Sequence, residues 1–129
     1  MEAKAATGVG NYIEVSDYRH AVVFIDFAGT ANMTIKCVGS IGAGDETTIV
    51  TENASPDATA AQSGTNSYEF IQMVDLQDGS PVDGDTGIVV VADDHRMLSI
   101  NVDGLKWLNF RITARSGGNA TVKVKLFRD

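Results

Sequence analysis

Apolar and polar residues alternate along much of this chain with a repeat of two. The clearest run lies near the C-terminus, where Leu108, Phe110 and Ile112 alternate with polar residues. Because successive side chains of a strand point to opposite faces, this repeat predicts half-buried β-strands. Alternating or β-branched runs predict strands at residues 12–15, 20–28, 31–38, 47–51, 67–76, 86–92, 96–102, 106–114 and 119–127. The pattern therefore predicts an all-β fold: an antiparallel β-sandwich, jelly-roll-like, with about eight to nine strands.

The last two predicted strands are separated by Ser116-Gly117-Gly118, which predicts a tight turn and an antiparallel hairpin. On this interpretation one face of the hairpin is apolar and points to the core, and Ala114 belongs to this face. The opposite face is polar and basic and carries the chain's one tryptophan; it comprises Trp107, Asn109, Arg111, Thr113, Arg115, Thr121, Lys123 and Lys125. We expect binding to take place on this outer face.

The length of 129 residues predicts one domain with one core. We expect an N-terminal arm at residues 1–11 and a single β-sandwich domain at residues 12–129, with a long polar loop at about 39–66. The first residues lack the apolar run of a signal peptide, and no run has membrane-spanning length, so a soluble protein without an export signal is expected. The single cysteine, Cys37, excludes an internal disulfide and is predicted to point inward.

Charge is unevenly distributed along the chain. The formal net charge is −7, which argues against nonspecific nucleic-acid binding. Residues 1–102 carry a charge of −11 and residues 103–129 carry +4, a segregation typical of a contact surface. The strand at 20–28 is also apolar on its second face, at Val22 and Phe24. Such strands are normally covered on both faces, so a loop or another subunit is expected there.

Candidate chemistry is sparse, and the sequence predicts no enzyme and no cofactor. It has no nucleophile elbow, phosphate-binding loop or zinc-ligand set. The aspartates at residues 75–94 could bind calcium, but their Asp-Gly pairs are typical of β-turns, which we favour. Trp107 has three interpretations: it could stack on a sugar ring, anchor a protein interface, or cover the sheet beneath a loop or strand.

Several stretches resemble small virion proteins of tailed bacteriophages. In these proteins a strand with a GL-x-aromatic pattern ending in Arg precedes an SGG-x-x-TV segment near the C-terminus. The matching stretches here are GLKWLNFR at residues 104–111 and SGGNATV at residues 116–122. Residues 11–26 fit the usual start of these proteins, a short strand and then a long hydrophobic one, and residues 68–85 also look like a stretch of them. The resemblance covers most of the chain.

This resemblance implies a capsid decoration or cement protein. Such a protein would be made in the host bacterial cytoplasm, bind the major capsid protein lattice on the virion surface, and stabilise the mature head without catalysis. It implies self-association, with a trimer favoured. The expected contact residues are Lys106, Trp107, Arg111, Lys123 and Lys125, with Val22 and Phe24 as a second contact or a seam between subunits. The alternatives are a carbohydrate-binding β-sandwich module and a phage neck or tail accessory protein.

Overall fold

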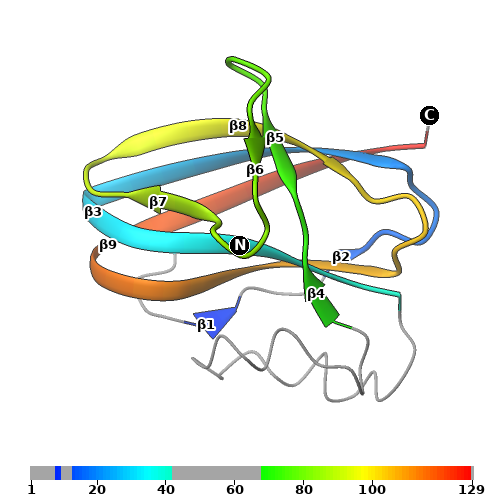
Figure 1. The fold of residues 1–129 in the computed structure, drawn as a ribbon, viewed down its shortest axis with the longest axis horizontal. Helices are drawn as coiled ribbons and strands as arrows, with labels where there is room; N and C mark the ends of the chain where they lie inside the picture. Colours follow the sequence, from blue (N-terminus) through cyan, green and yellow to red (C-terminus); the bar gives the residue numbers. More distant parts are fainter. Residues whose placement is uncertain (1–7, 10–12, 42–67, 129) are drawn as a thin grey trace.

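The computed structural model describes residues 8–9, 13–41 and 68–128, which form strands and connecting turns (Figure 1). Within these residues nine strands join in one hydrogen-bonded sheet, and every pairing is antiparallel. The strands are β1 (Gly8–Val9), β2 (Ile13–Glu14), β3 (His20–Ser40), β4 (Tyr68–Phe70), β5 (Met73–Asp75), β6 (Pro81–Val82), β7 (Ile88–Val90), β8 (Asp94–Asn101) and β9 (Trp107–Phe127). The predicted all-β antiparallel sandwich is confirmed. None of the described residues belongs to a helix of membrane-spanning length.

Two 21-residue strands, β3 and β9, organise the molecule. They pair along their whole length, from His20 opposite Phe127 to Ser40 opposite Trp107. Both bend near the middle, so one continuous sheet supplies both layers of the sandwich (Figure 1). We call layer one the set formed by β8, residues 20–28 of β3 and residues 119–127 of β9. Layer two contains residues 32–40 of β3 and 107–117 of β9, with β1, β2, β4 and β7 at its edges.

The predicted hairpin turn at Ser116-Gly117-Gly118 is wrong, because β9 continues through these residues as one strand. Both halves of β9 pair with β3, so the glycines form a corner between the layers and not a reversal. Gly118 has a φ of 81°, and a Cβ there would lie 2.5 Å from the Ala31 Cα. Only glycine permits this close crossing without strain. The strands predicted at 20–28 and 31–38 are likewise one strand, bent at Gly29, whose φ is 77°.

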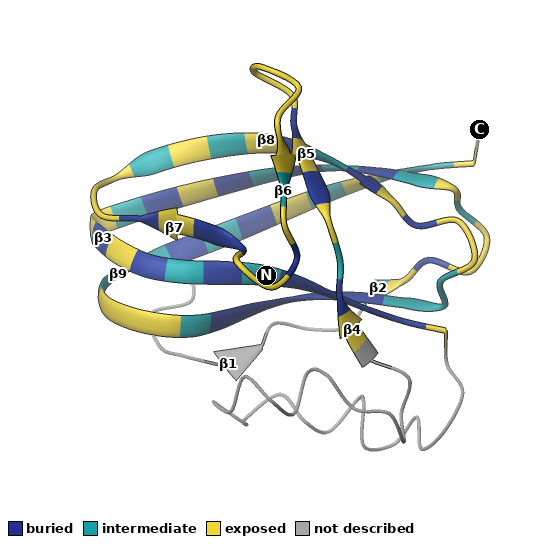
Figure 2. Cartoon of the chain, viewed as in Figure 1, coloured by how far each residue is buried: buried dark blue, intermediate teal, exposed yellow. Residues whose placement is uncertain are grey.

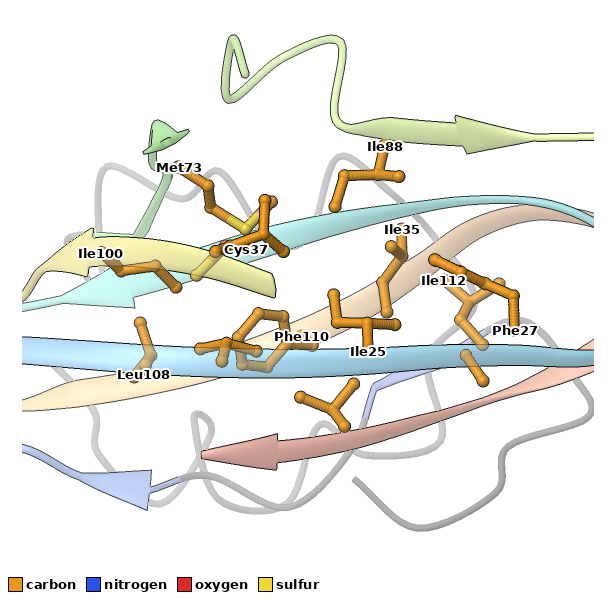
Figure 3. Packing of buried hydrophobic residues seen from close by; sticks show 14 of the residues in the cluster. Ile25, Phe27, Ile35, Cys37, Met73, Ile88, Ile100, Leu108, Phe110 and Ile112 are labelled. Atoms are coloured by element: carbon orange, nitrogen blue, oxygen red, sulfur yellow. The ribbon is translucent and has the colours of Figure 1, made fainter. Parts of the chain in front are cut away.

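One apolar cluster fills the space between the layers (Figure 3). Ile25 of layer one packs in the same cluster as Ile35 and Phe110 of layer two. Along the first half of β3, buried side chains alternate with less buried ones, which matches the predicted repeat of two (Figure 2). Cys37 points into this core as predicted, and burial raises the pKa of its thiol well above the ordinary value.

Other sequence-based expectations have mixed outcomes. Ala114 is exposed and not inward, because a register shift beside Ile35 places an extra residue in β9 and reverses the alternation. Part of the expected N-terminal arm belongs to the sheet, since Gly8 and Val9 of β1 pair with Ile112 and Arg111 of β9. The predicted strand at 47–51 and most of the expected loop at 39–66 lie outside the described residues.

Candidate protein-binding face

The bend in β9 separates the predicted contact residues. Lys123 and Lys125 follow the corner and point outward from layer one, opposite Phe24 and Val22 of β3. Trp107 precedes the corner and lies in layer two, opposite Ser40. Because the outer surfaces of the two layers face away from each other, these residues do not form the single face that a hairpin would have given.

Arg111 was expected on the outer surface, and this expectation is wrong. Its side chain has an exposed fraction of 0%, and the neighbouring outward residue Asn109 is at 1%. Val38 and Ser40, which lie beside them on β3, are buried too. The reverse side of layer two is therefore covered around Asn109 and Arg111 within a single chain, and Arg111 cannot contact a partner from this position.

Trp107 is half-buried at the start of β9, between Glu14 of β2 and Ser40 of β3. The Lys106 Nζ lies 5.6 Å from the centroid of its ring, within cation–π range. The Trp107 Nε1 is buried and has no hydrogen-bond partner among the described residues. This placement favours the third interpretation, a ring that covers the sheet, over a ring displayed for stacking on sugar.

The predicted residues that do come together lie on the outer side of layer one. Phe24 stands in register between Met97 of β8 and Lys123 of β9. The next row along the strands places Val22 between Ser99 and Lys125. We call this surface the layer-one face and define it by Val22, Phe24, His95, Met97, Lys123 and Lys125.

The centre of the layer-one face is apolar and open to solvent. Met97 has an exposed fraction of 49%, and the adjoining β5 region adds Leu76 at 47% and Val74 at 36%. Leu76 and Met97 line a groove of about 520 Å³ that also contains His95. Since the exposed side of an antiparallel sheet is normally polar, a contiguous apolar group here indicates a contact surface.

Charged and aromatic groups surround this apolar centre. The His95 ring stacks on Phe24 with centroids 6.0 Å apart. On β9 the Lys125 Nζ lies 5.4 Å from the Phe127 ring, while Lys123 is exposed. On the other side of the sheet, where it is in register with the core residue Ile25, Arg96 bridges Asp75 at 3.5 Å and Asp94 at 3.0 Å. The hydrogen bond from the His95 backbone N–H, followed by that from Arg96, lowers the pKa of Asp94.

The aspartates considered for calcium serve as turn residues in this structure. Asp75 accepts a hydrogen bond from the Gln77 backbone N–H at 2.9 Å, and Asp78 accepts one from Ser80 at 2.9 Å. Asp83 accepts one from the Thr86 hydroxyl at 3.1 Å. Across the part of the chain that the structure describes, no three acidic, histidine or cysteine residues are placed to hold a metal ion.

Sequence reasoning missed Met97, His95, Leu76 and Val74 as members of this region. The sequence carried a signal for Met97. Leu98 and Ile100 take the inward positions of this strand, so Met97 had to point outward. Its apolar character made it conspicuous on a face that otherwise carries Ser99. The proximity of Leu76 had no local signal, because it depends on β5 pairing with β8 across the β6 and β7 segments.

Comparison with known proteins gives one informative similarity. The fold is similar to the crystal structure of the SPBc2 prophage-derived protein YomS, with a TM-score of 0.55 and 13% sequence identity. The similarity covers 95% of this chain and 86% of the other. No protein-family model matches the sequence, and no curated protein matches it. At this level of identity the similarity shows a shared fold.

Proposed function

We propose that this chain is a non-enzymatic structural protein of a phage virion that binds the outer capsid surface and stabilises the mature head. The observation that carries the proposal is the layer-one face, an apolar surface bordered by Lys123 and Lys125 on a chain of net charge −7. Such a surface suits a protein partner, because apolar area supplies affinity and placed charges supply orientation. The prophage origin of the protein with a similar fold supports the phage assignment.

The physical basis of the role is multivalency. A capsid lattice presents the same contact many times at fixed spacing, so copies that are linked to one another bind it with high avidity. Each copy therefore needs only a modest contact. We propose that Lys106 and the solvent-exposed part of Trp107, both half-buried at the start of β9, belong to a separate contact with the lattice, because they lie on the opposite layer from Lys123 and Lys125.

The test is to measure the abundance of this protein in purified particles of the source virus, relative to the major capsid protein, by quantitative mass spectrometry. A decoration role predicts an abundance comparable to that of the capsid protein, because only a lattice offers so many sites. A trace amount would assign the protein to the neck or tail. Absence from particles would contradict a virion role.

A binding assay on particles that lack the protein then tests the surface. Lys123→Glu should weaken binding about tenfold or more, because it reverses a charge beside the apolar centre. Arg19→Glu is the matched control, since Arg19 is exposed near one end of β3 and off the layer-one face. No observation favours the carbohydrate-binding alternative, because Trp107 is half-buried and the aspartates considered for calcium, Asp75 and Asp78, are used in turns.

A further inference from the structure

We infer that the layer-one face is the seam between two copies of this chain, packed face to face about a two-fold axis that runs parallel to the strands. The inference rests on the proposed function only in treating this face as a protein-binding surface. It assigns this face to a second copy, and the paired chains are then the linked copies that bind the lattice with high avidity. The argument comes from the order of apolar, basic and acidic groups across the face.

The groups are arranged in rows that cross the strands. One row runs from Lys123 through Phe24 to Met97, and Leu76 follows because its backbone N–H bonds to the Met97 carbonyl at 2.9 Å. Beyond Leu76, the turn between β5 and β6 carries exposed Asp78. The face is therefore basic at its β9 side and apolar in the middle, and one exposed aspartate, Asp78, lies at its β5 side.

A two-fold axis parallel to the strands, between β3 and β8, makes this order complementary to itself. It places β9 of one copy over the β5 region of the other, so the aliphatic stem of Lys123 lies over Leu76 of the same row and its ammonium points toward the turn that carries Asp78. It also places Phe24 over Met97 and Asp26 over His95 of the second copy. A methionine sulfur against an aromatic ring is a favourable contact, and a carboxylate beside an imidazole is compatible in charge.

The other face-to-face arrangement is disfavoured by charge. An axis perpendicular to the strands would place β9 over β9, and Lys123 and Lys125 would then meet the same lysines of the second copy. Like charges brought together across an interface oppose association. The charge order thus selects one of the two symmetric packings, and two sheets packed this way are about 10 Å apart.

Sedimentation equilibrium of the purified chain tests the inference directly. The wild type is expected to be a dimer, and Met97→Glu should weaken dimerisation about 100-fold or more by charging the centre of the seam. Val89→Glu is the control, because Val89 is also an exposed apolar strand residue, at 56%, but lies on β7 in layer two. Circular dichroism checks that both variants fold.

Cross-linking tests the direction of the axis. Lys123→Cys and Leu76→Cys change exposed residues at the two ends of one row, three strand spacings or about 14 Å apart, and the native Cys37 is buried. A short bis-maleimide should link a mixture of the two variants into a dimer far more efficiently than it links either variant alone. Efficient linking of each variant to itself would overturn the parallel axis.

Three further results would also overturn the inference: a wild type that stays monomeric at about 200 μM, a trimer, or a dimer that Met97→Glu and Val89→Glu affect equally. A wild type that is monomeric at this concentration has a dimer dissociation constant above it, which is weaker than most specific interfaces show. These measurements use no virus particles. A monomer that still binds particles through Lys123 would retain the virion role and assign the face to the capsid.

Discussion

At the scale of single residues, the difference between predicted and observed roles is largest at Arg111. Alternation placed Arg111 correctly on the outer side of β9. It is nevertheless not exposed to solvent, because the outer side of layer two is buried around Asn109 and Arg111. Lys123 occupies the same kind of alternating position and is exposed. The sequence pattern specifies which side of a sheet a residue takes, whereas its exposure depends on what the rest of the chain places there.

Arg111→Ala is therefore expected to destabilise the fold and not merely to weaken binding. Removing a fully buried arginine side chain leaves a cavity and disrupts the interactions made around it, at a cost of about 3 kcal/mol. Arg115→Ala is the control, because Arg115 is exposed, although its Nε donates to the Gly118 carbonyl at 2.8 Å; a loss of about 1 kcal/mol or less is expected. Urea denaturation measures both, and equal losses would contradict the buried role.

At the scale of elements, the strand pattern was predictable and the connections were not. Most of the described strand residues fall in runs that the repeat of two identifies. The glycine-containing breaks at Gly29 and at Gly117-Gly118 looked like turns, because glycine with a positive φ serves a reversal and a corner equally well. What decides between them is pairing: each half of β9 finds its partner in β3, more than 60 residues away in the chain. For the same reason only the β3 and β9 residues of the layer-one face were predicted. The residues of β8 and the β5 region reach this face only through long-range pairing.

The corner itself gives a prediction that separates crowding from backbone strain. Gly118→Ala adds a Cβ that would lie 2.5 Å from the Ala31 Cα and 2.7 Å from the Ala28 carbonyl oxygen, at a φ of 81°. Gly79→Ala meets no described atom within 4 Å at a φ of 77°. The control should lose about 1 kcal/mol from conformation alone, and Gly118→Ala about 3 kcal/mol or more, because steric overlap adds to it.

Thermal or urea unfolding of these two variants checks the corner. If residues 116–118 formed a free hairpin turn, Gly118 would behave like Gly79 and the two losses would be similar. A clearly larger loss for Gly118→Ala supports a close crossing of β3 and β9 at this point.

At the scale of the whole molecule, both layers are made from the same two strands. A sandwich of two separate sheets could loosen one sheet before the other, whereas here β3 and β9 run through both layers and share one core cluster. Neither layer can lose its pairing without exposing apolar side chains of the other. The fold should behave as one cooperative unit, and the layer-one face should remain rigid until the whole domain unfolds.

The single tryptophan makes this cooperativity measurable. Trp107 lies in layer two, so its fluorescence reports that layer, while far-UV circular dichroism reports the strands of both. Ile25→Val removes one buried methylene in layer one and should cost about 1 kcal/mol. In a cooperative fold this distant change lowers the unfolding midpoint seen by both probes to the same extent. If the fluorescence midpoint stayed at its wild-type value while the dichroism midpoint fell, the layers would unfold independently, and the layer-one face would not share the stability of layer two.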